Sequence, residues 1–292
     1  MIELKLSQGA KPGHGGILPA VKLTEEIARI RHVPMGQDVI SPAAHSTFST
    51  PAGLLEFVRE LRRLSGGKPV GFKLCIGKKE EFLGICKAML ETGITPDFIT
   101  VDGGEGGTGA APTEMTNSVG TPLRDALIFV NRALLGIGLR DKVRVVASGK
   151  VFSAFHLLRV VALGADTANS ARGMMFSLGC IQSRSCNTDH CPTGIATQNP
   201  SRNKALVVED KGRRVANFHR EIIENLTELL AVSGLGSLEE LEPRHINHRV
   251  HGTVIKNYAQ LYPGISGSCL LSQASVPEPW QESWATAHAD HW

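Results

Sequence analysis

The sequence has no apolar run approaching about 20 residues, the length a helix needs to cross a bilayer, and no signal-peptide pattern at Met1. We therefore expect no membrane association and a cytoplasmic location. The sequence also has no large excess of positive or negative charge. Its net charge of +3 is small and dispersed, which argues against nucleic acid as a partner. A disulfide framework is absent as well, because Cys75, Cys86 and Cys269 are scattered.

What the sequence does contain is a short polar loop with three cysteines, GCIQSRSCNTDHCPTGIATQ, at residues 179–198. Cys180, Cys186 and Cys191 follow the spacing C-x5-C-x4-C, and thiolates are the soft ligands that iron–sulfur clusters and zinc prefer. The loop offers no fourth cysteine, which a cubane cluster or a four-cysteine zinc site would need. Three thiolates suit a three-iron 3Fe–4S cluster, and we favour that interpretation.

Two alternatives for the loop stay open. His190, next to Cys191, would complete a zinc site of three thiolates and one imidazole. In the other alternative the thiols are ordinary reduced side chains of a cytosolic loop.

The chain before this loop alternates short apolar strands with amphipathic helices. Strands are expected at 2–6, 38–40, 70–75, 97–102, 143–148 and 165–171. Helices are expected at about 24–31, 51–65, 80–91, 121–135, 153–163 and 173–178. This order requires parallel strands with helices outside, because parallel neighbours need crossover connections. The predicted class is α/β.

About six β/α units can be counted, which leaves two architectures. A (β/α)8 TIM-type barrel needs eight units, so two would be missing before residue 2. An open doubly wound sheet of six strands would be complete. The barrel is favoured by Ser148–Lys150 and Asn169–Arg172, two small-residue turns that lead into helices and can offer backbone N–H groups to a phosphate. A phosphate site after the last two strands is usual in barrels.

The predicted carboxyl ends of the other strands carry further polar groups, since working residues of parallel α/β folds lie there. These are Gln8, Lys11, Ser41, His45, Lys73 and the glycine-rich loop 103–109. Lys73 is either a solvated strand residue or, on a strand buried on both faces, the partner of a flavin or a substrate carbonyl. The loop is either a flexible lid or backbone approaching a flat ligand.

Four segments in this order, SQGAKPGHGGILP, LCIG, DGGEGGTGAAP and the cysteine loop, resemble the synthase domain of FMN-dependent glutamate synthase large subunits. They resemble the FMN-binding glutamate synthase domain-2 family most closely, over Met1 to about Arg202. This resemblance implies a (β/α)8 barrel that holds FMN and a 3Fe–4S cluster. It also implies reduction of 2-iminoglutarate, formed from 2-oxoglutarate and ammonia, to L-glutamate.

The resemblance also assigns roles to individual residues. Cys180, Cys186 and Cys191 match cluster ligands, and Gln8, Lys11 and Arg31 match residues that hold the 2-oxoacid. Lys73 matches a catalytic lysine at the flavin's pyrimidine edge. The remaining cofactor positions are Gly149, Lys150, Ala171 and Arg172 at the phosphate, and Gly106, Gly107 and Gly109 bordering the ring.

Three features depart from the family pattern. The glutaminase module with its nucleophilic cysteine is absent, so ammonia is expected from solution or from another chain. His14 stands where glutamate synthases commonly have Glu, and Lys150 replaces a glycine of the phosphate loop. The first two β/α units are not in this sequence, which predicts a longer protein or a separate N-terminal chain.

We expect three regions: a partial barrel at 1–202 that includes the cluster loop 179–198, a helical extension at 203–262, and a tail at 263–292 that is either disordered or a partner-binding segment. An amphipathic helix is predicted at 210–232 and a short helix from SLEELEP. Expected partners are a ferredoxin-like or pyridine-nucleotide-dependent electron donor, a glutaminase chain and further copies in an oligomer. The alternatives are a related amine-forming or amine-oxidising flavoenzyme, such as an N-methylglutamate synthase component, and a non-catalytic iron–sulfur or scaffold subunit.

Overall fold

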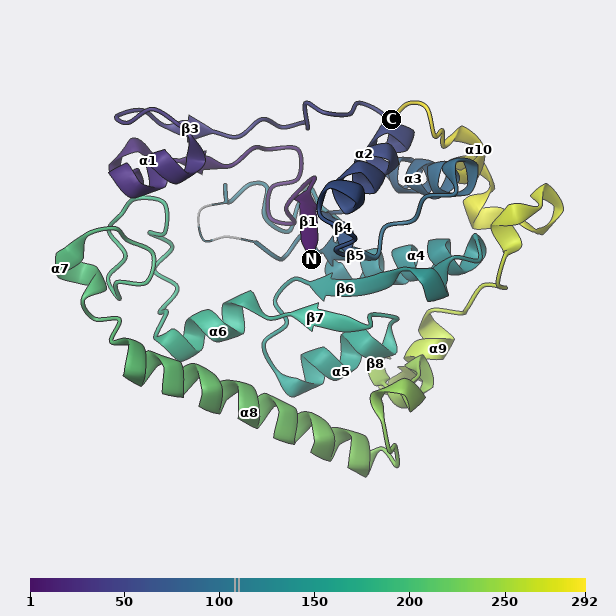
Figure 1. Ribbon diagram of the computed structural model, residues 1–292. Helices are drawn as coiled ribbons and strands as arrows, with labels where there is room; N and C mark the ends of the chain where they lie inside the picture. Colours follow the sequence, from purple (N-terminus) through teal and green to yellow (C-terminus); the bar gives the residue numbers. More distant parts are fainter. Residues whose placement is uncertain (108, 110) are drawn as a thin grey trace.

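Five parallel strands form the centre of the computed structural model, which describes residues 1–107, 109 and 111–292 (Figure 1). Thr108 and Ala110, which belong to the glycine-rich loop, lie outside the described residues. The central strands, in their order across the sheet, are β1 (Ile2–Lys5), β4 (Val70–Leu74), β5 (Phe98–Asp102), β6 (Arg144–Ser148) and β7 (Thr167–Asn169). The α/β prediction with parallel strands is confirmed.

The described helices include the predicted ones, with bounds that differ by a few residues, and three short ones at 200–203, 258–261 and 281–286 that were not predicted. They are α1 (Glu25–Arg31), α2 (Pro51–Leu64), α3 (Lys79–Thr92), α4 (Leu123–Gly136), α5 (Ala154–Ala162), α6 (Ala171–Leu178), α7 (Pro200–Asn203), α8 (Val208–Val232), α9 (Tyr258–Leu261) and α10 (Gln281–Thr286). Local signals start and stop them: the Thr50 hydroxyl accepts a hydrogen bond from the Gly53 N–H at 2.9 Å, and Gly93 ends α3 with φ 67°. None of these helices is long and apolar enough to span a membrane.

The strand order distinguishes a barrel wall from a doubly wound sheet. Successive strands of the sheet are neighbours throughout, without the reversal of order that a doubly wound sheet has. Because parallel crossovers are right-handed, such an order keeps the helices on one face. The alternating side chains agree, since Phe72, Val101 and Ala147 belong to the apolar core whereas Lys73, Thr100 and Asp102 carry polar groups on the other face. The fold is a partial barrel of the TIM type.

One predicted strand lies elsewhere. Val39–Ile40 does form a strand, β3, but it pairs antiparallel with β2 (Ile17–Leu18) in a separate two-stranded sheet. The Asp38 carboxylate accepts a hydrogen bond from the Ala20 N–H at 2.7 Å, which ties this segment to the 3-10 turn after β2. The described central sheet therefore has five strands instead of six.

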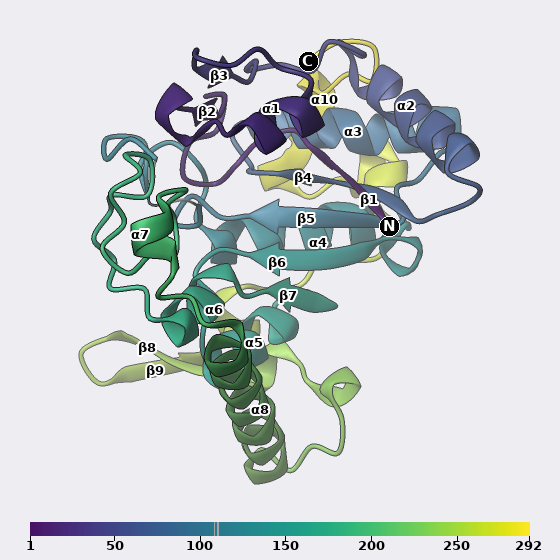
Figure 2. The same cartoon turned by 60° about the vertical axis from the view of Figure 1, so that its left-hand side comes forward.

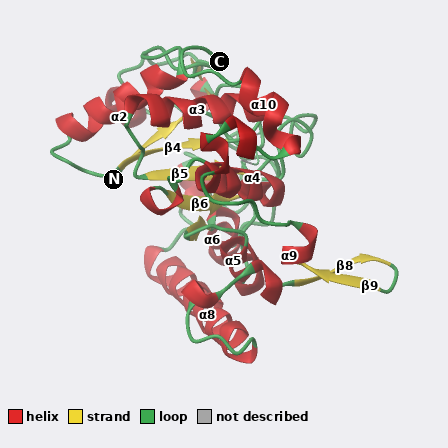
Figure 3. Ribbon diagram, turned by 90° about the vertical axis from the view of Figure 1, so that its right-hand side faces the viewer, coloured by secondary structure: helices red, strands yellow, loops and turns green. Residues whose placement is uncertain are grey.

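The region after the cysteine loop forms a helical layer with one hairpin. Helix α8 lies across α5 and α6 (Figure 1), and its Leu226 is buried in the core. SLEELEP forms a single 3-10 turn, Leu238–Glu240, instead of an α-helix. The hairpin of β8 (Asn247–His251) and β9 (Val254–Asn257) projects from the fold (Figure 3) and was not predicted, because its exposed side chains show no apolar alternation.

Residues 263–292, which we expected to form a tail, pack against α3 and α4 in the structure. Trp284 of α10 is only 8% exposed and lies 5.1 Å from the Lys87 Nζ of α3. Trp280 stacks on Phe129 of α4 with ring centroids 5.1 Å apart. Burial of aromatic surface holds this segment in place, although 10 of its 30 residues are Gly, Ser or Pro.

Candidate functional site

The carboxyl ends of the central strands face the segments that carry most of the predicted site residues. In Figure 2 the arrowheads of β5 and β6 point to the side where α1 and α7 lie. Strand register aligns Lys73 with Lys5 on one side and Thr100 on the other, and it aligns Asp102 with Ser148. One face of the sheet thus carries a row of polar side chains that leads to this edge.

Asp102, the last residue of β5, organises the edge. It is 3% exposed; its carboxylate accepts hydrogen bonds from the Gly9 N–H at 2.8 Å and from the Ser148 hydroxyl at 2.8 Å. It thereby joins the loop after β1 to the loop after β6. We did not predict this residue, although its place at the end of the strand FITVD was a signal.

Glu105 is a second residue that we did not predict. The residue that precedes α4 is Pro122, which makes no side-chain capping hydrogen bond. The Glu105 carboxylate accepts the Leu123 N–H at 2.9 Å, which satisfies the first turn of the helix. The contact fixes the glycine-rich loop against α4.

A cavity of about 830 Å³ opens beside β1 and β4. Its lining includes Lys5, Gln8, His14, Cys75 and Trp292. Burial, with the negative charges of Asp102 and Glu105, raises the pKa of the Cys75 thiol to about 12, so this thiol is a neutral wall of the cavity.

Lys5, Lys11 and Lys73 lie close together near this cavity, and Lys5 is the one that we did not predict as a site residue. Burial, followed by the positive charges of Lys73 and Lys11, lowers the pKa of Lys5, whose Nζ donates to the Gln8 side chain at 3.2 Å. Lys11 is 7% exposed, with its Nζ 3.5 Å from the Gly15 carbonyl oxygen. The structure thus brings Gln8, Lys11 and Lys73 into one positively charged region.

Arg31 does not join this group. It is exposed in the last turn of α1 and lines neither described cavity. A basic residue there also interacts favourably with the helix C-terminus.

A second cavity, of about 500 Å³, contains most of the predicted cofactor residues. It is lined by Gly106, Gly107 and Gly109 from the glycine-rich loop, by the cations Lys150 and Arg172, and by Cys186. Gly149 has φ 141°, a backbone conformation that favours glycine, and positions Lys150 after β6. Ala171, the first residue of α6, does not belong to the lining.

The donors around this cavity fit a phosphate group. Two cations share the lining, and α6 begins with free N–H groups at the same point. The Ser170 hydroxyl, just before α6, is buried and has no hydrogen-bond partner among the described residues, but it does not line the cavity. An orphaned buried hydroxyl is costly unless a ligand satisfies it.

The three loop cysteines lie in different surroundings. The Cys180 Sγ accepts a weak hydrogen bond from the Arg172 guanidinium at 3.9 Å, and a Cβ at Gly109 would stand 2.6 Å from the Cys186 Sγ. Burial opposes ionisation of Cys191, but hydrogen bonds from the Thr193 hydroxyl and nearby backbone N–H groups outweigh it and lower the pKa to about 7. Lys22 Nζ donates to the Cys186 carbonyl oxygen at 2.8 Å and fastens the loop to the chain before α1.

The described loop is not arranged around a single ion. Zinc–sulfur bonds of about 2.3 Å place sulfurs about 3.8 Å apart in a tetrahedral site. No three of the ligand atoms of Cys180, Cys186, His190 and Cys191 lie within 4.8 Å of one another.

Known proteins resemble this chain over most of its length. Residues 1–236 match a conserved region in glutamate synthase. Glutamate synthase large subunit-like protein YerD of Bacillus subtilis is 43% identical over 259 residues, which cover 89% of this chain and 49% of YerD. Archaeal glutamate synthase (NADPH) of Methanocaldococcus jannaschii is 37% identical over 241 residues, covering 82% and 46% respectively.

A third relative is ferredoxin-dependent glutamate synthase 2 of Synechocystis, which is 33% identical over 93% of this chain and 17% of its own length. The chain spans less than half the length of each of these relatives. The match over residues 1–236 covers the central sheet and the whole cysteine loop. The chain belongs to the glutamate synthase family.

Proposed function

We propose that this chain holds FMN and a 3Fe–4S cluster within a glutamate synthase-type enzyme. Bound FMN would supply hydride chemistry, reducing 2-iminoglutarate, formed from 2-oxoglutarate and ammonia, to L-glutamate. The observation that carries this proposal is the second cavity, where Lys150, Arg172 and the glycine-rich backbone share a lining with Cys186. A phosphate site and a cluster ligand at one cavity would bring the two cofactors close to each other.

The phosphate would be held by Lys150 and Arg172. Gly106, Gly107 and Gly109 would let backbone border the cofactor without side-chain contact. Cys180, Cys186 and Cys191 would ligate the cluster, and the Arg172 contact to Cys180 links the two sites. Residues 1–202 would form this cofactor-binding unit and residues 203–262 its helical extension.

Electrons would come from a partner protein. Names of the relatives include both NADPH and ferredoxin, which supports a pyridine-nucleotide-dependent or a ferredoxin-like donor. Ammonia would come from solution or from a glutaminase chain, and the assembly would be oligomeric and cytoplasmic.

The substrate would bind near the loop after β1. Lys11 and Gln8 supply a cation and an amide there, and the Asp102 contact to Gly9 holds the loop in place. Arg31, the second predicted cation for a dicarboxylate, stays a prediction, because α1 leaves it exposed.

Substrate reduction tests this proposal directly. FMN-loaded protein, chemically reduced without oxygen, should be reoxidised by ammonia with 2-oxoglutarate but only weakly with monocarboxylic 2-oxoacids. Lys11→Ala should raise the 2-oxoglutarate concentration needed by about 10- to 100-fold, since a charged contact contributes about 1.5–3 kcal/mol. Arg31→Ala should do the same if α1 contributes the second cation.

Lys22→Ala is unsuitable as the control because Lys22 anchors the cysteine loop, whereas exposed Arg29 of α1 makes Arg29→Ala a matched control. Equal reoxidation by monocarboxylic acids would show that the site does not recognise a dicarboxylate.

Lys73 gives a second prediction, for the flavin potential. Lys73→Met should lower the FMN reduction potential by about 30 mV or more, which corresponds to the loss of about 1.4 kcal/mol from the reduced form. Redox titration of the bound flavin measures it. Lys68→Met is the matched control, because exposed Lys68 precedes the opposite end of the same strand. A Lys73→Met potential equal to that of the control would remove Lys73 from the flavin site.

A further inference from the structure

The segment after α10 is fastened to two helices by its backbone. Ala287 and Ala289 are 2% and 4% exposed. The Ala287 carbonyl oxygen accepts a hydrogen bond from Lys87 Nζ of α3 at 2.8 Å, and the Ala289 carbonyl oxygen accepts the Ala52 N–H of α2 at 2.8 Å. The backbone of His288 lies so close to α3 that a Cβ on Gly84 would stand 2.5 Å from its carbonyl oxygen. These contacts fix the path of the segment.

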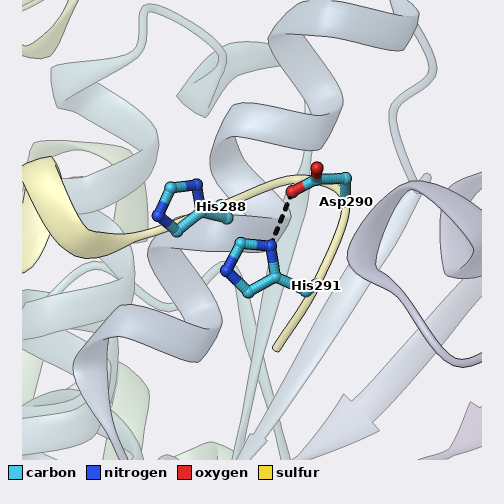
Figure 4. Close-up of side chains that lie close together, drawn as sticks. All are labelled: His288, Asp290 and His291. Carbon is cyan, nitrogen blue, oxygen red and sulfur yellow. Dashed lines mark hydrogen bonds and ion pairs between the residues drawn. The ribbon is translucent and has the colours of Figure 1, made fainter.

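This anchoring turns three polar side chains to the same exposed side. The alternation of buried Ala287 and Ala289 leaves His288 and Asp290 facing solvent, and a bend at 289–290 returns His291 toward His288. The two imidazole rings stack with centroids 4.2 Å apart. His291 Nδ1 lies 2.8 Å from the Asp290 Oδ1 (Figure 4).

We propose that His288, Asp290 and His291 form a second, independent metal site, for Zn²⁺. One ligand atom from each of the three lies within 4.8 Å of the other two, close enough to converge on a single ion once the two stacked rings turn apart, since an imidazole binds a metal in its ring plane. Two imidazoles and a carboxylate are a three-ligand set that zinc accepts, with water in the fourth position. Mg²⁺ and Ca²⁺ prefer oxygen ligands, so the two imidazoles select against them.

The proposed metal site lies beside the 830 Å³ cavity. Trp292, next to His291, lines the 830 Å³ cavity, and Phe82 of α3 lines the same cavity. An ion bound by the three residues would restrain the conformation of residues 288–291 and so the position of Trp292 at the wall of the cavity. The site is separate from the cysteine loop and does not depend on the proposed function.

Metal titration with two ions separates this site from the cysteine loop. Co²⁺ bound by nitrogen and oxygen gives d–d absorption without the sulfur-to-metal charge transfer that cysteine ligands produce. We expect one equivalent of Co²⁺ without charge transfer in the intact protein, displaced by Zn²⁺. His288→Ala combined with His291→Ala should abolish that equivalent, and Asp290→Asn should weaken it by about 10- to 100-fold.

The exposed pair His248 and His251 of β8 provides the matched control, His248→Ala with His251→Ala, which should leave the equivalent unchanged. Cu²⁺ quenching of tryptophan fluorescence gives a second readout, because Trp292 is adjacent to His291. Undiminished Co²⁺ binding in the His288/His291 variant, or binding seen only with charge transfer, would overturn the proposal.

Discussion

Cys186→Ser is expected to abolish the iron–sulfur cluster. Cys186 is one of only three thiols in the loop, and a 3Fe–4S centre has no spare ligand among them. Its sulfur also borders the second cavity, where Gly109 leaves room for it. The oxidised wild-type protein should show the EPR signal of a three-iron centre, and the variant should retain essentially no cluster iron.

His190→Ala serves as the control in the same loop and also tests the zinc alternative. His190 is exposed, and its Nδ1 lies 2.6 Å from the Thr188 carbonyl oxygen, so it has no place in a cluster of three cysteines. Iron content should therefore be unchanged. Zinc without iron in anaerobically purified protein, lost on His190→Ala, would show that the loop is a zinc site.

The second large effect is expected at the phosphate end of the flavin site. Lys150→Ala combined with Arg172→Ala should weaken FMN binding on the order of 10²–10⁴-fold, because each charged contact contributes about 1.5–3 kcal/mol. Flavin fluorescence during titration measures the dissociation constant. Arg213→Ala, at a residue on α8 whose side chain is 73% exposed, is the control and should bind FMN normally.

Riboflavin makes this test specific, since it carries the same ring without the phosphate. The double variant should bind riboflavin as the wild type does. A parallel loss of riboflavin and FMN would show that the two residues act on the ring or on the fold instead of on the phosphate.

Several elements were predictable because their signals are local. Helix α2 has its capping Thr50, a proline in its first turn and apolar residues such as Leu54 and Val58 on one face, all within one stretch. The β–α alternation likewise required parallel strands, and the loop spacing placed three thiols together in sequence. The second cavity contains the glycines and cations that the resemblance to the family had pointed to.

The sequence by itself therefore determined the α/β class, the helices with local caps and the family. Only the tertiary structure decided how distant segments meet. The Asp102 carboxylate joins two loops because it accepts hydrogen bonds from Gly9 and Ser148, which are 93 and 46 residues away in the sequence. No local sequence pattern indicates such contacts. The strand at 39–40 joined β2 instead of the central sheet, and Trp284 ordered a segment whose composition resembles a tail. Both outcomes depend on the rest of the folded chain. A short strand pairs with whichever strand edge lies beside it, and an aromatic side chain is buried only where other elements leave an apolar surface for it.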